Sequence, residues 1–474
     1  MLPPDFKTFF HPKSIAIIGA STKPFKFGNL FLKAILDFQY PGKIFPVNPR
    51  GEKIYGLDSW MLEDIPEPID LVYITVPAKQ VPEEIQKCAG RTKSVIILTA
   101  GFKETGEEGK KIEEKCAEIA RKNGIRVIGP NCFGIYYAKG GITLLPGGNF
   151  PKESGNIAML SQSGGHSVNF VLLGQSSDLK FSKVISYGNA LDLDFPDFLE
   201  YLNEDPETNI VAAYIEGVRN IRKLKKVIKD FNKPLIIWKC GLRGELLHDT
   251  ARAAASHTGF LAGNSEIWKG FFQQNNILLV DSFEELLDTT KALAYLPALD
   301  NTIDYRNRIG VIGGGGGIGI AITDVSNRFG LRIPKLSEEV KENLKEYIPI
   351  EGTSINNPLD TGNPMFRWGS GYRKILNIFM GDPNISVLIN DLIVDYVLDL
   401  RAIHRVLRDY KEEFNIPIVI ILRKLLNTLN NVALERKYRK IRDKFHASQI
   451  PVFPSFNRGV CALANYLNYY KNIK

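Results

Sequence analysis

The chain has few cysteines, and those it has are scattered. No two of them stand in the C-x-x-C spacing that redox motifs and zinc sites share. A disulfide framework is typical of short chains with closely spaced cysteines, which a sequence of 474 residues does not resemble. We therefore predict neither a disulfide-stabilised fold nor a metal site. The cysteines are Cys88, Cys116, Cys132, Cys240 and Cys461.

Long apolar runs are also missing from the chain. A helix that spans a bilayer needs about 20 consecutive apolar residues, and no stretch comes near that length. Residues 1–13 lack the apolar core of a secretion signal. We therefore expect a cytoplasmic protein without a membrane partner.

A concentrated patch of one charge is lacking as well, although the net charge is +8. The densest basic stretch, residues 436–444, also contains acidic residues and is typical of a solvated helix face. Nucleic-acid binding is the alternative, but no zinc finger or RNP motif accompanies the stretch. We expect no nucleic-acid partner. A modest positive field would suit small polyanionic ligands.

The sequence does show a regular alternation of short β-branched runs and longer amphipathic segments. Such alternation is typical of βαβ units and parallel sheets. A polar stretch at residues 297–308 and a softer break near residues 145–155 divide the chain into three parts. We predict three α/β domains, at residues 1–148, 149–298 and 299–474.

Each predicted domain contains its own set of strands. In the first they lie at residues 14–18, 43–47, 71–76, 94–99 and 126–128, with a helix at 109–122. In the second they lie at residues 156–160, 181–186, 210–215, 234–239 and 277–280. In the third they lie at residues 308–312, 386–390, 416–421 and 450–453.

The first predicted strand runs into Gly19, Ala20 and Ser21, and a helix follows. A strand, a tight glycine turn and a helix N-terminus together form an anion-binding site. The spacing is not the G-x-G-x-x-G of dinucleotide sites, and Arg50 follows the second strand where those sites carry an acid. An arginine there favours a ribose that carries a phosphate, as in NADP or coenzyme A. The alternative is a solvated Arg50 in an Asn-Pro turn.

Other candidates for the same cofactor follow neighbouring strands, because ligands of open parallel sheets bind beyond the carboxyl ends of the strands. Val76 and Pro77 end the third strand, and Asn131, which would position a ligand or cap a turn, follows the fifth. Cys132 has no histidine beside it to activate a nucleophile, so we expect an inert thiol. The predicted cofactor-binding residues are Gly19, Ala20, Ser21, Lys43, Asn48, Arg50, Val76, Pro77 and Asn131, with Lys43 a weaker candidate than Arg50.

A second turn of this kind begins the helix that follows the strand at residues 156–160. Backbone N–H groups converge in such a turn, and the helix dipole adds about half a positive charge. Two serine hydroxyls can donate further hydrogen bonds. The turn fits inorganic phosphate or a phosphoryl group, and a purely structural turn is the alternative. Its residues are Ser161, Gln162, Ser163, Gly164 and Gly165.

One histidine, His257, lies in the run Ala-Ala-Ala-Ser-His-Thr-Gly. Its small neighbours leave the imidazole open to act as a base, a ligand or a nucleophile. The local sequence fits a structural role equally well, but a phosphate turn in the same domain favours a phosphorylated imidazole. Glu216 ends the strand at residues 210–215 and precedes a glycine. Its carboxylate is expected to fix the tautomer of His257, with a surface acid as the alternative.

Taken in order, these motifs resemble those of the alpha subunits of nucleoside-diphosphate-forming acyl-CoA synthetases. That family includes ADP-forming acetate–CoA ligase and is related to succinyl-CoA synthetase. The resemblance covers nearly the whole chain. The segments that carry it are Ile17-Ile18-Gly19-Ala20-Ser21, Val47-Asn48-Pro49, Val76-Pro77, Gly129-Pro130-Asn131-Cys132-Phe133-Gly134, Ser161-Gln162-Ser163-Gly164, Tyr187-Gly188-Asn189, Tyr214-Ile215-Glu216-Gly217-Val218, Ala255-Ser256-His257-Thr258-Gly259, residues 313–319 and Asn357-Pro358-Leu359-Asp360.

The resemblance implies a fold and roles for particular residues. It implies a Rossmann-like CoA-binding domain followed by two flavodoxin-like, succinyl-CoA synthetase-like parallel-sheet domains. It also implies that His257 becomes phosphohistidine and that Glu216 supports it. Residues 161–164 would hold phosphate, and residues 19–21 would hold coenzyme A.

The chain departs from the family's pattern in three places, the smallest of which is Asn357-Pro358-Leu359-Asp360 where the family has Asn-Pro-Val-Asp. After Ser163-Gly164 the family continues Ala-Leu-Gly, whereas this chain has Gly165-His166-Ser167. His166 is expected near the phosphate turn, which leaves the acyl group open. Five glycines at residues 313–317 replace a less glycine-rich turn, which leaves the role of the third domain open.

The reaction implied by the resemblance is acyl-CoA + ADP + phosphate ⇌ carboxylic acid + CoA + ATP, by way of an acyl phosphate and phosphohistidine. Making ATP needs Mg²⁺ and a nucleotide site, and the chain has no G-x-x-x-x-G-K-[ST] motif. Three domains already account for almost every residue. We therefore expect ADP, ATP and Mg²⁺ on a separate ATP-grasp beta subunit, and hence a hetero-oligomer.

Two other functions fit some of these motifs. A CoA- or nucleotide-binding regulatory protein would use the same folds without turnover, and His257 would not be phosphorylated. An NADP-dependent oxidoreductase would need the glycine spacing that the first turn lacks.

Overall fold

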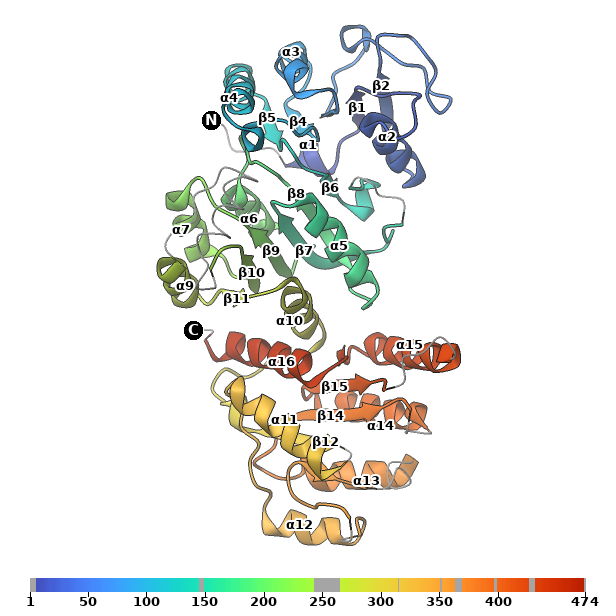
Figure 1. Ribbon diagram of the computed structural model, residues 1–474, viewed down its shortest axis with the longest axis vertical. Helices are drawn as coiled ribbons and strands as arrows, with labels where there is room; N and C mark the ends of the chain where they lie inside the picture. The colour runs from blue at the N-terminus through green and yellow to red at the C-terminus, as the bar shows by residue number, and fades with distance from the viewer. Residues whose placement is uncertain are drawn as a thin grey trace. The chain divides into compact units, whose positions relative to one another are not determined.

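The computed structural model describes residues 6–144, 149–242, 265–313, 315–349, 352–362, 369–395, 399–425 and 431–472, without the side chains of 369 and 370. Helices and strands alternate along the chain (Figure 1). The chain divides into two compact units, Met1–Phe283 and Glu284–Lys474. Within the described ranges, no helix is long and apolar enough to cross a membrane.

The first sheet has the strand order β2-β1-β3-β4-β5, and all neighbouring strands are parallel. Both faces of β1 are buried, with Ile15 and Ile17 in one core and Ala16 and Ile18 in another. Burial on both faces explains why these strands are continuous apolar runs in the sequence. The elements are α1 (Lys7–Phe10), β1 (Ser14–Ile18), α2 (Phe27–Asp37), β2 (Lys43–Val47), β3 (Leu71–Ile74), α3 (Val81–Lys87), β4 (Ser94–Ile97), α4 (Glu107–Lys122) and β5 (Arg126–Ile128).

The second sheet has the order β11-β10-β9-β7-β8-β6, in which β6 alone among the described strands runs antiparallel to its neighbour. It shares a hydrophobic core with one face of the first sheet. The elements are β6 (Gly134–Tyr136), β7 (Ser154–Ser161), α5 (Gly164–Gln175), β8 (Phe181–Ser186), α6 (Phe195–Glu204), β9 (Ile210–Ile215), α7 (Ile221–Asp230), β10 (Leu235–Lys239), α9 (Ser265–Gln274) and β11 (Leu278–Val280).

The second unit is built on the sheet β13-β12-β14-β15-β16, which is parallel throughout. Helix α10 is tied to α16 by two hydrogen bonds of 2.5 and 3.0 Å from Arg458 to Asp288. The elements are α10 (Phe283–Tyr295), β12 (Ile309–Gly313), α11 (Gly316–Arg328), α12 (Glu338–Lys345), β13 (Leu359–Asp360), α13 (Gly369–Met380), β14 (Val387–Ile393), α14 (Leu400–Phe414), β15 (Ile418–Arg423), α15 (Val432–Ala447), β16 (Val452–Phe453) and α16 (Phe456–Lys471).

Short 3-10 helices complete the described structure. They are η1 (Leu62–Asp64), η2 (Ala78–Gln80), η3 (Lys103–Thr105), η4 (Ala138–Gly140) and η5 (Tyr305–Asn307).

The three sheets share one topology, since each places its first parallel strand between its second and its third. Chain order therefore reverses beside β1, β7 and β12. Ligands of open α/β sheets bind at such a reversal, beyond the carboxyl ends of the strands. The turn at Gly19 follows β1, the turn at Ser161 ends β7, and Gly313 ends β12. All three glycine-rich turns of the sequence thus occupy the ligand-binding position of the topology.

The predicted class of three parallel-sheet α/β domains is confirmed. Five predicted strands have the bounds of β1, β2, β5, β8 and β9, and the others agree to within a few residues. The short strands β6 and β13 were not predicted. The division between predicted domains at residues 298 and 299 stays a prediction.

Candidate active site

The turn after β1 is shaped by close backbone contacts. Gly19 has a φ of 89°, which favours glycine. A Cβ on Gly28, near the start of α2, would lie only 2.1 Å from the carbonyl oxygen of Gly19. The Thr75 hydroxyl, just beyond β3, donates to the carbonyl of Ile18 over 2.8 Å. The helix N-terminus is therefore held tightly against the turn.

Side-chain amides fix the backbone carbonyls of the same turn. Asn48 donates to the carbonyl of Ala20 over 3.0 Å, and its side-chain oxygen accepts the N–H of Arg50 over 2.9 Å. Asn29 donates to the carbonyl of Ser21 over 2.7 Å. The Arg50 side chain is exposed and forms no ion pair with the described residues. It is therefore available to a ligand phosphate.

Val76, Pro77 and Asn131 lie beyond the carboxyl ends of the first sheet, as Gly19 does. The Thr99 hydroxyl donates to the carbonyl of Val76 over 2.7 Å. Asn131 has a φ of 56°, and its N–H donates to the carbonyl of Thr99 over 2.8 Å. The structure thus brings most of the predicted cofactor residues to one edge of the sheet.

Cys132, next to Asn131, is 2% exposed. Its thiol donates to the carbonyl of Ile97 over 3.4 Å. Burial raises the pKa of Cys132 to about 12, which agrees with the inert thiol expected from the sequence.

Lys43 does not join this group, which corrects its prediction as a cofactor-binding residue. It is the first residue of β2, so it lies at the amino edge of the sheet, opposite the turn at Gly19. Its ammonium pairs with both carboxylate oxygens of Glu67, at 2.8 and 2.9 Å.

The turn between β7 and α5 is partly closed by its own side chains. The sequence predicts that the Ser161 hydroxyl donates to a ligand. In the structure it donates to the carbonyl of Ser163 over 2.7 Å, so its proton is already used. Ser163 caps α5 by accepting the N–H of His166 over 3.3 Å. A Cβ on Gly164 would lie 2.8 Å from the Phe133 ring, whereas a Cβ on Gly165 would meet almost only solvent. The turn is therefore packed against Phe133 at Gly164 and accessible at Gly165.

Glu216, directly after β9, is held at both ends of its backbone. Register places Ser161 of β7 beside Tyr214 of β9. The Gln162 side-chain oxygen accepts the N–H of Glu216 and, over 3.0 Å, the N–H of Gly217. Lys239, at the end of β10, donates to the carbonyl of Glu216 over 2.8 Å. The sequence analysis missed Lys239, although a lysine closing an apolar strand was a usable signal.

The Glu216 carboxylate is only half satisfied by the described residues. Its Oε1 accepts the Tyr214 hydroxyl over 3.1 Å. Its Oε2 is buried without a partner among the described residues, as is Nε2 of Gln162. Buried polar atoms are nearly always hydrogen-bonded, so this pair indicates a place for a ligand or a further side chain.

His166 stands in the first turn of α5, among aromatic rings. Its ring centroid lies 4.6 Å from that of Tyr214, 4.9 Å from that of Trp238 and 5.7 Å from that of Phe283. Burial lowers the pKa of His166, and the nearby charge of Glu216 opposes this only in part. The lowered pKa favours the neutral imidazole. The place of His166 beside the phosphate turn is the one expected from the sequence.

His257 lies outside the described residues, which end at 242 and resume at 265. Its predicted contact with Glu216 therefore stays a prediction. Within the described ranges, no group of three or more His, Cys, Asp or Glu side chains is arranged to hold a metal ion.

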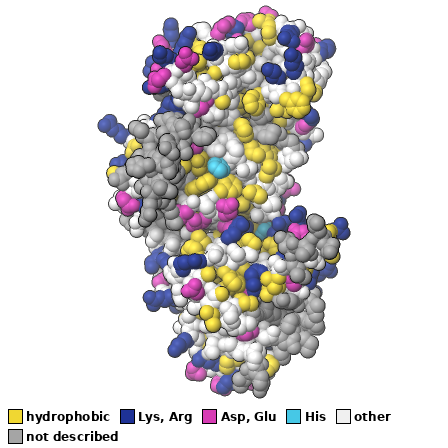
Figure 2. Space-filling model, in the orientation of Figure 1, with side chains coloured by type: hydrophobic (Ala, Val, Ile, Leu, Met, Phe, Trp, Pro, Cys, Tyr) yellow, Lys and Arg dark blue, Asp and Glu magenta, His cyan; other side chains and the backbone are white. Residues whose placement is uncertain are grey.

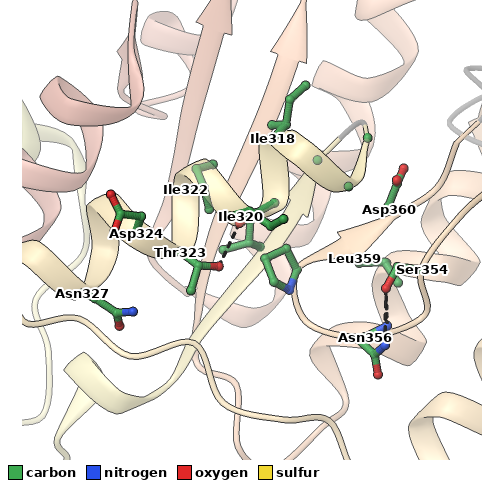
Figure 3. Close-up of a pocket in the computed structure, with 16 residues that line it drawn as sticks. Ile318, Ile320, Ile322, Thr323, Asp324, Asn327, Ser354, Asn356, Leu359 and Asp360 are labelled. Carbon is green, nitrogen blue, oxygen red and sulfur yellow. Dashed lines mark hydrogen bonds between the residues drawn. The ribbon is translucent and has the colours of Figure 1, made fainter.

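The third sheet carries a pocket of about 430 Å³ beside its own glycine turn. Figure 3 shows it between α11 and the loop that carries Ser354 and Asn356. Asn357 fixes this loop, because its side chain accepts the N–H of Val311 over 3.0 Å and donates to the carbonyl of Ile309 over 2.8 Å. The first residue of the motif Asn-Pro-Leu-Asp thus has a structural task.

The basic stretch at residues 436–444 lies in α15 and is neutralised in part by acids of the same helix. Arg439 pairs with Glu435, and Arg442 pairs with Asp443, both at 2.8 Å. On the face shown in Figure 2, Lys and Arg side chains are interspersed with Asp and Glu side chains. The stretch is a solvated helix face, as predicted.

Comparison with known proteins agrees with this geometry. A model of the CoA-binding domain matches residues 13–138, and a model of the succinyl-CoA ligase-like flavodoxin domain matches residues 154–293. The chain is 36% identical over 387 residues to the alpha subunit of ADP-forming acetate–CoA ligase II from Pyrococcus furiosus, covering 80% of this chain and 81% of that protein. It is 34% identical over 483 residues to the alpha subunit of ligase I from the same organism, covering 98% of both.

A solved structure shows the same fold across the whole chain. It is described as the dinucleotide-forming acetyl-coenzyme A synthetase 1 of Candidatus Korarchaeum cryptofilum in complex with phosphate and ADP. The TM-score is 0.83 at 28% identity, and the match covers 98% of each chain. This chain therefore belongs to the family of ADP-forming acetate–CoA ligases, and the relatives it matches at 34% and 36% identity are alpha subunits.

Proposed function

We propose that this chain is the alpha subunit of an ADP-forming acyl-CoA synthetase. The reaction is acyl-CoA + ADP + phosphate ⇌ carboxylic acid + CoA + ATP. The observation that carries the proposal is that the glycine turn at Ser161 lies beside Glu216, where the strand order of the second sheet reverses. One oxygen of the Glu216 carboxylate is buried there without a partner among the described residues. Family membership supports the same activity.

Coenzyme A binds along the carboxyl edge of the first sheet. The turn at Gly19, Ala20 and Ser21, held by Asn48, receives the diphosphate, and the exposed Arg50 receives the ribose phosphate. Val76, Pro77 and Asn131 guide the remainder of the molecule toward the second sheet. The match of residues 13–138 to a CoA-binding domain supports this ligand over NADP.

Phosphate binds at Ser161, Gln162, Ser163, Gly164 and Gly165 and attacks the thioester carbonyl. The carbon–sulfur bond breaks, CoA leaves with a proton as the thiol, and an acyl phosphate forms. The backbone N–H groups at the start of α5 stabilise the anion.

His257 then attacks the phosphorus atom of the acyl phosphate. A nitrogen–phosphorus bond forms, and the carboxylate leaves. Glu216 accepts the N–H of the other ring nitrogen and so keeps the attacking nitrogen unprotonated. Transfer of the phosphoryl group from phosphohistidine to ADP completes the cycle.

The nucleotide step takes place on a partner. Relatives of the chain are named as alpha subunits. We infer a beta subunit of the ATP-grasp type that binds ADP, ATP and Mg²⁺, in a hetero-oligomer with this chain. The domains are residues 1–148 for CoA, 149–298 for phosphoryl transfer, and 299–474. The alternative of a regulatory protein without turnover is not favoured by ligase relatives at this identity.

Phosphorylation of the isolated chain tests the proposal. Incubation with acetyl-CoA and labelled phosphate should give an acid-labile, base-stable phosphoprotein, and His257→Ala should not be labelled. Equal labelling of the His257→Ala variant would show that another residue carries the phosphoryl group. A panel of other acyl-CoA esters in the same assay identifies the acyl group.

A further inference from the structure

The orientation of the Gln162 side-chain amide is dictated by its surroundings. Two backbone N–H groups, of Glu216 and Gly217, point at the same atom of this amide. Only the carbonyl oxygen can accept them, so the NH₂ group must face the other way. The side chain is 3% exposed, and its Nε2 has no partner among the described residues. A buried donor is therefore aimed, in a fixed direction, from the first residues of the phosphate turn.

The Glu216 carboxylate presents the complementary acceptor. Its Oε2 is buried and likewise lacks a partner among the described residues. The hydroxyl of Tyr187 is likewise buried without a partner among the described residues. Leaving a buried polar group unsatisfied costs about 1–3 kcal/mol, so an arrangement of several is retained where a ligand completes it.

We propose that Gln162 is the positioning residue of this site, whose carbonyl oxygen holds the Glu216 backbone while its amide nitrogen binds a phosphate oxygen. One side chain then couples the presence of phosphate to the placement of the carboxylate. The inference rests on the proposed function, because it takes phosphate as the ligand of the turn and Glu216 as the support of His257.

The coupling follows from how the Glu216 backbone is held. Lys239 fixes its carbonyl from the end of β10, and Gln162 fixes its N–H from the turn between β7 and α5. The Lys239 ammonium donates to the carbonyls of Glu216 and Cys240, and neither residue belongs to the phosphate turn. A movement of the Gln162 amide would therefore rotate the Glu216 peptide about its Lys239 end and turn the carboxylate. Phosphate bound to Nε2 opposes that movement.

Phosphate binding to the purified chain tests the donor end of Gln162. Inorganic phosphate should raise the melting temperature of the wild-type chain by mass action. In Gln162→Glu the carboxylate still accepts both backbone N–H groups, but it has no proton to donate and repels phosphate. We expect its phosphate affinity to fall by about ten- to a hundredfold, and its melting temperature without phosphate to fall as well, because the new carboxylate is buried beside Glu216. A phosphate response equal to that of the wild type would overturn the proposal.

Gln162→Met tests the acceptor end, because it leaves two buried N–H groups without an acceptor. Its melting temperature without phosphate should fall by about 3–6 °C. Gln175→Met is the matched control, since Gln175 is an exposed residue at the other end of α5. An equal effect of both substitutions would show that Gln162 holds nothing.

A double-mutant cycle separates positioning from simple structural support. The measured rate is the phosphorylation of the chain by saturating acetyl phosphate, which removes differences in binding. If Gln162 acts through Glu216, its substitution matters little once Glu216 is changed. Adding Gln162→Met to the Glu216→Gln variant should then lower the phosphorylation rate by less than about a further twofold. If the rate of the double variant is reduced by the product of the two single-variant reductions, the proposal is overturned.

Phosphate binding and labelling, measured together, also separate this inference from the proposed function. If the wild-type chain binds phosphate through Gln162 but acetyl phosphate never labels it, the proposed function fails and the phosphate site stands. If the chain is labelled on His257 but Gln162→Glu binds phosphate normally, the proposed function stands and the role of Gln162 fails.

Discussion

The two glycine turns of the first unit occupy the same topological position but differ in how their polar groups are satisfied. At Gly19 the neighbouring amides of Asn29 and Asn48 are bonded to the backbone, and Gly28 packs against the turn. At Ser161 one side-chain atom of Gln162, Nε2, and one of Glu216, Oε2, are buried without partners among the described residues. The polar groups around the first turn are thus bonded within the chain, whereas the second turn leaves two buried polar atoms for a ligand or a further side chain. We interpret the first as a binding site and the second as a site of chemistry.

Glu216→Gln should have the largest effect of the substitutions that test this difference between the two turns. The amide can keep the bond to Tyr214 but cannot accept an imidazole N–H at the position of Oε2. We expect phosphorylation of the chain by acetyl phosphate to slow by about a hundredfold, measured by label incorporation. CoA affinity should stay the same, and a parallel loss of CoA binding would contradict a role confined to the second turn.

Gly28→Ala tests the tight packing of the first turn. The added Cβ would overlap the Gly19 carbonyl, so the turn and the start of α2 must separate. A strain of about 2 kcal/mol corresponds to roughly thirtyfold weaker CoA binding by calorimetry. The control is Gly270→Ala in α9, where a Cβ meets nothing within 4 Å. Unchanged CoA binding in Gly28→Ala would mean that the turn does not need this contact.

Arg50→Ala tests the outer part of the first turn. The side chain is exposed, so water screens its charge and moderates the loss. We expect about tenfold weaker binding of CoA and little change for dephospho-CoA in the same titration. If the affinities for CoA and dephospho-CoA fall equally, Arg50 does not bind the ribose phosphate. The alternative of a solvated Arg50 in an Asn-Pro turn would then hold.

His166→Leu should have the smallest effect, on the pH dependence of stability. The pKa of His166 is lower in the folded chain than in the unfolded chain, so the unfolded chain binds more protons as the pH falls. Its contribution to stability is complete above the unfolded value of about 6.5 and is lost on acidification below it. Melting temperatures measured from pH 7.5 down to pH 5 should therefore fall less steeply in the variant. Identical slopes would show that His166 is not held neutral.

The strands could be predicted closely because their cause is local. Continuous apolar runs such as β9 are buried on both faces of a sheet between parallel neighbours, so the local sequence is enough to predict them. The two strands that were not predicted are short, since β13 has two residues and β6 has three.

The candidate site could be predicted in its parts but not in its connections. Gly19, Ser161 and Glu216 follow strands, so their common edge follows from topology. Lys43 was assigned to this edge although it is the first residue of β2, which places it at the opposite edge of the sheet. The predicted strand at residues 43–47 already contained that information. The bond from Gln162 to Glu216 depends on the register of β7 against β9, which is set by packing between distant segments. Sequence spacing contains no such information.

Strand β6 belongs to the second sheet although the sequence places it in the predicted first domain. Residues 134–136 precede the predicted division at 148, yet they pair with β8 of the second sheet. Cleavage at residue 148 would leave that strand bound to the second sheet only by noncovalent contacts. A fragment beginning after it would expose the edge of β8 and be prone to aggregate. Any evolutionary exchange of the first domain for another would therefore have to supply a replacement strand, or to break the chain before Gly134.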